Sequence, residues 1–179
     1  MRTTLRAFSA AFAVVLALPG GLVFGQAQPA RFHPPVTPAE RALDATLKAA
    51  DADDSVLDNL LQGRGERDYR PTVDYRSSLT AALLAAIRKA ERDMVRRDCG
   101  GRYKSGEVCG LDYNPITCAQ DRIGQRFVAT MSDAAGHSRI VLASAPHGPG
   151  HATYVMVEEA GAWKLDGVSC SAGSRFNTG

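Results

Sequence analysis

The sequence predicts an α+β protein in which N-terminal helices pack on one face of an antiparallel sheet. Apolar residues recur at helical spacing, every three or four positions, in the first half of the chain. After residue 125 they recur at every second position, and turn residues separate the alternating segments closely enough for a meander of about four strands. Helices followed by consecutive strands are typical of the α+β class.

The first 25 residues have the parts of a secretory signal peptide. A short basic start precedes an uncharged apolar stretch of 12 residues, and small residues follow it. Cleavage is expected after Gly25, or alternatively after Ala27. An uncleaved membrane anchor is the weaker interpretation, because Pro-Gly-Gly interrupts a segment that falls short of the roughly 20 apolar residues that span a bilayer. We therefore expect a periplasmic or secreted mature protein without a membrane span.

The helical part begins after a proline-rich leader. Residues 26–36 contain three prolines and are expected to be flexible, and residues 37–179 to form a single domain. Thr37 and Glu40 have the spacing of a capping box, with proline at the first helical position, which predicts the start of a helix. Ser55 is a candidate cap for a second, short helix.

The longest predicted helix covers about residues 77–97. Leucine, isoleucine and methionine recur there in steps of three and four, and Arg88, Glu91 and their charged neighbours fill the polar positions. Four strands are predicted beyond it, at residues 126–132, 138–144, 153–159 and 162–168.

Four cysteines predict two disulfides, since their number is even and the chain is expected to be exported. They are Cys99, Cys109, Cys118 and Cys170, and no two have the Cys-x-x-Cys spacing of a redox pair or zinc knuckle. Three connectivities are open. We favour Cys99–Cys109, because the glycine-rich segment between these cysteines is a turn-rich loop that one disulfide would hold. Cys118–Cys170 would then join the start of the strand region to its end.

The net charge excludes two classes of partner. The chain has 21 basic and 19 acidic residues, and the two excess arginines, Arg2 and Arg6, lie in the predicted signal peptide. The mature chain is therefore neutral, without the basic surplus typical of proteins that bind nucleic acid or anionic membranes. A basic run that includes Arg64 and Arg76 is expected to be solvated surface. The partner that we expect is therefore a protein or a small-molecule ligand in the cell envelope.

No cofactor and no metal site are predicted. His147 and His151 lie in a Gly/Pro loop that offers no carboxylate or cysteine to complete a ligand set. Asp51-Ala-Asp53 begins like a calcium-binding loop, but the glycine and glutamate required at the sixth and twelfth positions are absent.

Three short segments carry a resemblance to a known family. Residues 75–79 (Tyr-Arg-Ser-Ser-Leu) open a helix, residues 111–116 (Leu-Asp-Tyr-Asn-Pro-Ile) precede Ala-Gln-Asp, and residues 163–166 (Trp-Lys-Leu-Asp) close the meander. Over roughly residues 69–171 the chain resembles the small exported bacterial proteins grouped as domain of unknown function 3828. These proteins are similar to the nuclear-transport-factor-two-like, or cystatin-like, cone superfold.

The resemblance implies helices lying across a bent sheet with a cavity between them, but no particular reaction, because that superfold hosts enzymes, toxin-neutralising proteins and plain binding modules. In its enzymes, acids at the mouth of the cone act as general bases. Asp112 and Asp121 are therefore the candidate bases if the chain is a small isomerase- or hydrolase-type enzyme. The other interpretation is that these aspartates orient turns.

The candidate ligand-binding residues are Tyr113, Gln120, Asp121 and Trp163. We favour a non-catalytic binding domain over the enzyme, because orienting turns is the more common role for aspartate beside proline and glycine.

Overall fold

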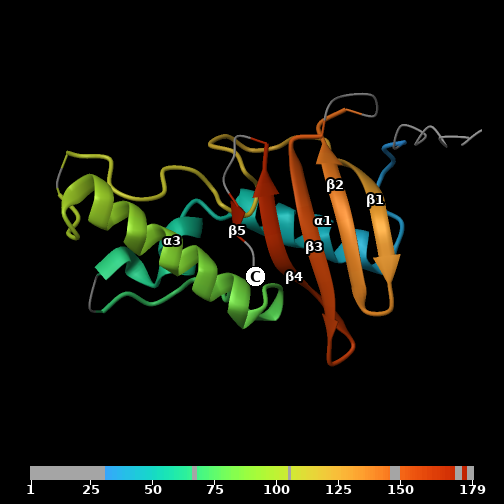
Figure 1. The fold of residues 1–179 in the computed structure, drawn as a ribbon, viewed down its shortest axis with the longest axis horizontal. Helices are drawn as coiled ribbons and strands as arrows, with labels where there is room; N and C mark the ends of the chain where they lie inside the picture. The colour runs from blue at the N-terminus through green and yellow to red at the C-terminus, as the bar shows by residue number, and fades with distance from the viewer. Residues whose placement is uncertain (1–30, 66–67, 105, 146–149, 172–174, 177–179) are drawn as a thin grey trace, which may run out of the picture.

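The computed structural model describes residues 31–65, 68–104, 106–145, 150–171 and 175–176 (Figure 1). The predicted signal peptide, its cleavage site and residues 26–30 lie outside these ranges and stay predictions. The rest of the predicted leader contacts the domain: His33 and Val128 exchange backbone hydrogen bonds of 2.9 and 2.8 Å. Within the described ranges, no helix has the length and apolar character needed to cross a bilayer.

The first helix, α1 (Pro38–Ala52), begins where the capping box predicts. Thr37 Oγ1 accepts a hydrogen bond from the Glu40 N–H at 3.2 Å, and Glu40 Oε2 accepts one from the Thr37 N–H at 2.9 Å. The proline at the first helical position has no N–H to leave unsatisfied. Leu43 and Leu47 of this helix are fully buried in the core.

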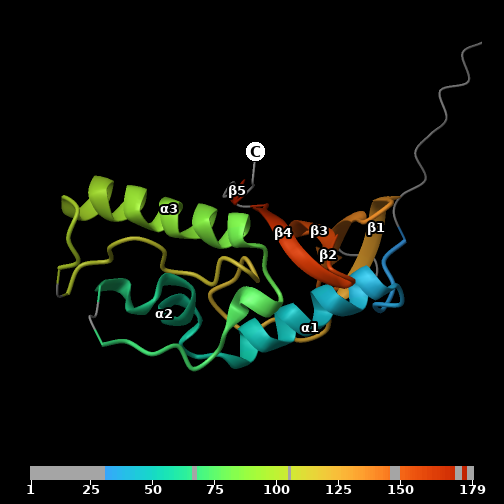
Figure 2. The ribbon, with the colours of Figure 1, turned by 90° about the horizontal axis from the view of Figure 1, so that it is seen from below.

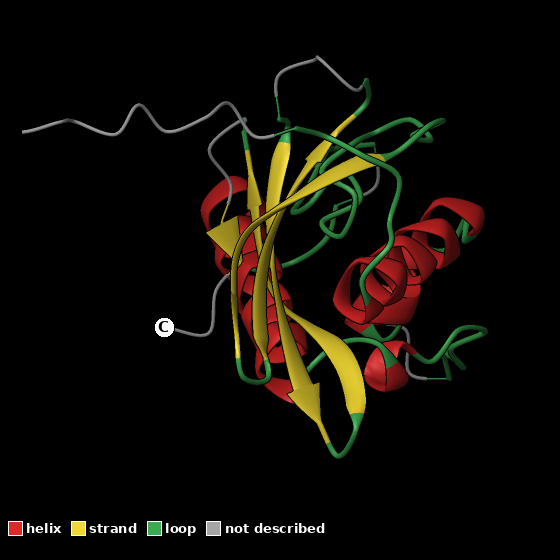
Figure 3. Cartoon of the chain, turned by 90° about the vertical axis from the view of Figure 1, so that its right-hand side faces the viewer, coloured by secondary structure: helices red, strands yellow, loops and turns green. Residues whose placement is uncertain are grey.

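The second half of the chain forms one antiparallel sheet. Its strands, in spatial and chain order, are β1 (Phe127–Ala134), β2 (His137–Ala143), β3 (Ala152–Glu159), β4 (Ala162–Cys170) and β5 (Arg175–Phe176). The predicted α+β class and antiparallel meander are confirmed, and the two-residue β5 is the addition that periodicity does not predict. The register shifts at Met131 of β1 and at Asp166 of β4, which each add one residue to the strand. Such bulges increase twist, and the sheet is visibly twisted (Figure 3).

The helices form two groups around this sheet. α1 crosses one face (Figures 1 and 2), and its leucines pack with Ile140, Tyr154 and Leu165 from β2, β3 and β4. α2 (Val56–Leu61) packs against α3 (Ala81–Cys99), and both lie beside the β4 edge.

The predicted start of the long helix is wrong. Residues 75–77 form a separate 3₁₀ turn, η2 (Tyr75–Ser77), and α3 begins only at Ala81, after its N-cap Thr80. The intervening residues bond to β4 instead. The Thr80 N–H donates to the Leu165 carbonyl at 2.9 Å, and the Leu165 N–H donates to the Ser78 carbonyl at 2.8 Å. Helix periodicity cannot anticipate this pairing, because its partner lies more than eighty residues away.

Both favoured disulfides form. Cys99–Cys109 joins the end of α3 to the loop that follows it, with the Cα atoms 5.9 Å apart. Cys118–Cys170 joins the loop before β1 to the end of β4, with the Cα atoms 5.5 Å apart. All four cysteines are therefore paired.

The buried Glu40 carboxylate links the leader, α1 and the sheet. It accepts hydrogen bonds from the N–H groups of Val36 and Thr37 and from the Thr130 hydroxyl of β1 at 2.7 Å. Burial by itself raises the pKa of this carboxyl. The hydrogen bonds from Thr37, Val36 and Thr130, together with the nearby His33, outweigh burial and hold the pKa below its ordinary value of 4.5.

Glu40→Gln is expected to make stability less sensitive to acid. A carboxyl with a lowered folded-state pKa stabilises the fold above its unfolded-state pKa, and that contribution is lost as the pH falls through the folded-state pKa. Urea titration at pH 7 should give the wild type a free energy of unfolding about 1 kcal/mol higher than that of the variant. The difference should shrink below about pH 4.5. A difference that stays constant down to pH 3 would contradict the role assigned to Glu40.

Candidate functional site

The loop of residues 111–126 connects the helical layer to β1 and carries most of the predicted site residues. Asn114 holds its turn: its side-chain oxygen accepts from the Ile116 N–H at 3.0 Å, and its side-chain nitrogen donates to the Ala50 carbonyl of α1 at 3.1 Å. Cys118 fastens the same loop to β4. The turn-orienting role predicted for the aspartates of this loop therefore belongs to an asparagine, which the sequence analysis did not single out.

The loop and the C-terminal end of α1 surround a pocket of about 320 Å³, which we call the loop pocket. Four predicted site residues line it together: Asp112, Tyr113, Gln120 and Asp121. Trp163 is not among the residues that line this pocket. It lies on β4, half-buried against the core.

Two carboxylates of the loop pocket are held by other residues. Asp51, near the end of α1, forms a buried ion pair with Arg126. Asp53 accepts hydrogen bonds from the Asn59 side chain at 2.8 Å and from the Tyr75 hydroxyl at 2.9 Å. Burial, followed by the bond to Asp53 and its charge, raises the pKa of Tyr75, so this tyrosine remains a donor.

The two candidate general bases have similar surroundings. Asp112 and Asp121 are exposed, and neither has an ion-pair or hydrogen-bond partner among the described residues. A general base is tuned by burial or by a nearby charge. Asp112 and Asp121 are neither buried nor ion-paired with a described residue, and both line the pocket.

Two hydroxyls of the loop pocket have no hydrogen-bond partner in the described part of the chain. Thr117 is 1% exposed and Tyr113 is half-buried, and the hydroxyl oxygen of each is buried. An unpartnered buried polar group costs about 1–3 kcal/mol, and native proteins contain few of them. Both residues line the loop pocket, and surrounding atoms cover the hydroxyl oxygen of each.

A second pair of such atoms lies behind Asp51. The Tyr154 hydroxyl of β3 is fully buried, and neither it nor Arg126 Nε has a partner among the residues that the structure describes. Burial raises the pKa of Tyr154. The negative charge of Asp51 raises it further, and Arg126 opposes this effect. Asp51 thus joins the loop pocket to a polar cluster that reaches into the core.

The sequence analysis also missed a buried charge centre on α3. Glu91, placed at a polar position of the predicted helix, is only 2% exposed. Arg64, expected to be solvated surface, pairs with it at 3.1 Å, so that expectation is wrong. The signal available in the sequence was the Cys99–Cys109 disulfide, because it returns the following loop onto the last turns of α3.

The predicted histidine loop is described only in part. His147 lies outside the described residues, whereas His151 is half-buried and burial lowers its pKa. Among described residues, one group has ligand atoms close enough together to hold a metal: Cys99, Glu107 and Cys109. Its two sulfurs form a disulfide and are therefore not thiolate ligands.

The chain matches no protein-family model, no curated protein and no solved structure.

Proposed function

We propose that this chain is an exported, non-catalytic binding domain and that the loop pocket holds a small cationic ligand. The observation that carries the proposal is the Thr117 hydroxyl, which is 1% exposed, belongs to the pocket lining and has no partner among the described residues. A few fixed polar groups of this kind orient ligands in binding pockets. The Tyr113 hydroxyl is a second such group in the same pocket.

The charge of the loop pocket supports a cationic ligand. Asp53, Asp112 and Asp121 form no ion pair with any described residue, whereas Asp54 pairs with Arg122 at 2.8 Å. An ammonium group would gain charge-assisted hydrogen bonds there without breaking an existing ion pair. A volume of about 320 Å³ suits a small molecule.

Two further parts of the proposal have their own support. Two disulfides support export, because disulfides persist in oxidising compartments. The relationship to domain of unknown function 3828 and the cone superfold stays a prediction, and the position of α1 across a twisted sheet agrees with the fold that it implies. The catalytic alternative, with Asp112 or Asp121 as base, is less supported because both carboxylates are exposed.

Thr117→Val is expected to leave the free energy of unfolding of the ligand-free protein unchanged, or to raise it by up to about 1 kcal/mol, because it removes an unpartnered buried hydroxyl. Thr46→Val is the matched control. Thr46 is 4% exposed, but its hydroxyl donates to the Ala42 carbonyl at 2.9 Å. The free energy of unfolding of this second variant should be lower than that of the wild type by about 1 kcal/mol. Urea titration compares the two, and an equal loss in both would contradict the assignment of Thr117.

Ligand binding is tested with putrescine, glucosamine and ethanolamine, with acetate as the anionic control. We expect at least one amine to shift the backbone amide NMR signals of residues 112–121, and acetate to leave them unchanged. Thr117→Val and Asp121→Asn should each weaken that binding roughly tenfold. The proposal is overturned if no amine shifts these signals, or if both variants bind as the wild type does.

A further inference from the structure

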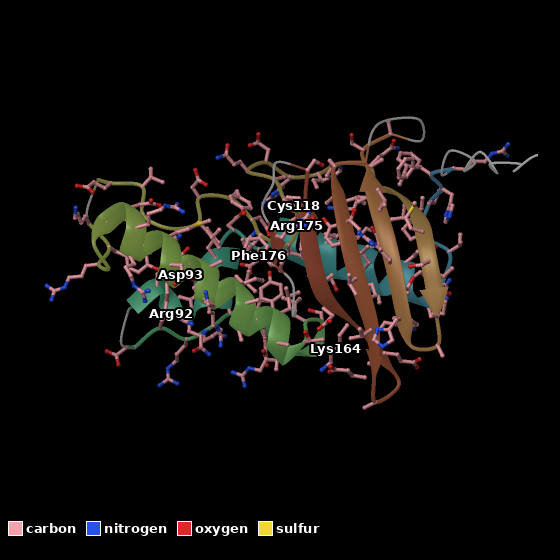
Figure 4. All side chains as sticks on the ribbon, viewed as in Figure 1. Arg92, Asp93, Cys118, Lys164, Arg175 and Phe176 are labelled. Atoms are coloured by element: carbon pink, nitrogen blue, oxygen red, sulfur yellow. A yellow bond between two sulfur atoms is a disulfide. The ribbon has the colours of Figure 1, made fainter. Side chains whose placement is uncertain are left out.

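A second hollow lies on the other side of α2, away from the loop pocket. Two adjoining cavities of about 220 and 720 Å³ share Gln62, Arg76, Leu84 and Arg88, and together we call them the arginine groove. The groove extends from the turn before α3 to the end of the β3–β4 hairpin, where Lys164 borders it. Figure 4 shows Lys164 on β4, beside the first turns of α3.

Arg88 is held in the groove by one of its nitrogens. Nε donates to the Leu60 carbonyl of α2 at 2.9 Å, which fixes the half-buried side chain across the two helices. The two terminal nitrogens have no acceptor among the described residues. Burial, followed by the positive charges of Arg76 and Arg92, lowers the pKa of Arg88.

The other buried or half-buried arginines near the core each have a carboxylate partner, which Arg88 lacks among the described residues. Arg64 pairs with Glu91, and Arg126 pairs with Asp51. No described carboxylate pairs with Arg88, although a desolvated guanidinium ordinarily has such a partner.

The acids that line the groove already have partners. Glu159 pairs with Lys164 at 3.2 Å, and Asp166 accepts a hydrogen bond from the Thr80 hydroxyl at 2.7 Å. Arg76 has only a 3.5 Å contact with Asp74, and its side chain is 71% exposed. Arg88 is therefore the guanidinium of the groove without a carboxylate partner among the described residues, and Arg76 has only its exposed contact with Asp74.

The rest of the groove lining mixes apolar residues with polar ones such as Gln62 and Thr80. Leu79 and Leu84 line the groove and are 1% and 6% exposed, and Ala82 lies beside them at the start of α3. A ligand that complements this surface has an anionic head for the arginines and a short apolar body for the leucines.

We propose that the arginine groove is a second binding site, for a small amphipathic anion whose carboxylate or phosphate group is held by Arg76 and Arg88. Bidentate hydrogen bonds from a guanidinium fit both kinds of head group. This site shares no lining residue with the loop pocket, so it does not depend on the function proposed above.

The test uses three probes on the disulfide-bonded protein: octanoate, inorganic phosphate and octylammonium. We expect octanoate to shift the backbone amide NMR signals of residues 79–84. Phosphate should bind the same residues more weakly, because it lacks the apolar body, and octylammonium should leave them unchanged. Phosphate binding that matches octanoate would assign the site to the anionic head alone and would overturn the amphipathic part of the proposal.

Arg88→Gln should weaken octanoate binding roughly tenfold or more. Arg92→Gln is the matched control, since Arg92 is exposed four residues further along α3 and does not line the groove (Figure 4). Arg76→Gln, at an exposed position, provides a second variant in case Arg88→Gln fails to fold. The proposal is overturned if octylammonium binds as tightly as octanoate, or if the variants at Arg76 and Arg88 that fold bind octanoate like the wild type.

Discussion

Glu91→Ala is expected to lower the free energy of unfolding by about 3–5 kcal/mol, because it leaves a buried charge without its partner. The carboxylate pairs with Arg64 at 3.1 Å and accepts hydrogen bonds from the Tyr103 hydroxyl at 2.7 Å and the Leu111 N–H at 2.6 Å. Burial and the bond to Glu91 raise the pKa of Tyr103 to about 12. Alanine removes the acceptor from three donors at once.

The packing around Glu91 leaves little room for compensation. Gly110 approaches so closely that a Cβ atom there would lie 2.3 Å from Glu91 Oε1, and its φ of +82° also favours glycine. The chain crosses the carboxylate at this point and covers it, whereas two of the freed donors remain partly exposed: Tyr103 is 43% exposed and the Arg64 side chain 27%.

Urea titration measures the loss, and Asp93→Ala on the same helix is the control. Asp93 pairs with Lys89 at 2.6 Å, but both side chains are exposed, so little change is expected there. Glu91→Gln keeps the shape of the side chain without its charge. Its loss of unfolding free energy should lie between those of Glu91→Ala and Asp93→Ala. If Glu91→Ala costs no more than Asp93→Ala, the buried centre does not support the fold as the structure indicates.

Removing the Cys118–Cys170 disulfide with alanine at both positions is expected to cost about 4 kcal/mol, and removing Cys99–Cys109 about 3 kcal/mol. The ranking follows from the length of the loop that each disulfide closes. The cysteines of Cys118–Cys170 are 52 residues apart, and those of Cys99–Cys109 are 10 residues apart. The longer loop restricts the unfolded chain more.

The two disulfides should also differ in their effect on ligand binding. Cys118 fastens the loop that lines the loop pocket, whereas Cys99 and Cys109 lie at the far end of α3. The Cys118 and Cys170 double variant should therefore lose amine binding, and the Cys99 and Cys109 double variant should retain it. Unfolding titrations and the NMR experiment with amines test both statements. A larger stability loss from the shorter loop, or unchanged amine binding in both variants, would contradict this ranking.

The secondary structure was largely predictable because its causes are local. The capping box at Thr37 predicts the first residue of α1, and alternation over residues 153–159 predicts β3 (Ala152–Glu159) to within one residue. The start of α3 was not predictable. Residues 78–80 pair with Leu165 of β4, and a pattern of neighbouring residues contains no information about that partner.

The candidate site likewise has a part that the sequence predicts and a part that it does not. Asp112, Tyr113, Gln120 and Asp121 are close in sequence, so one loop brings them together wherever it lies. The polar residues behind them come from elements far apart: Asp51 from α1, and Tyr154 from β3. Asn114 holds the turn through the end of α1, a contact that only the packed structure supplies.

The sequence by itself determined the α+β class and the meander, because periodicity and caps act over short stretches of chain. It favoured the disulfide pairing that forms but left the other two connectivities open. The tertiary structure decided which polar groups are buried. Glu91 and Arg64 have the sequence pattern of surface residues, yet they pair under a loop. No motif predicts that the Thr117 hydroxyl is buried without a partner among the described residues. The physical reason is that burial depends on which distant segment covers a residue, and neighbouring residues do not specify that segment.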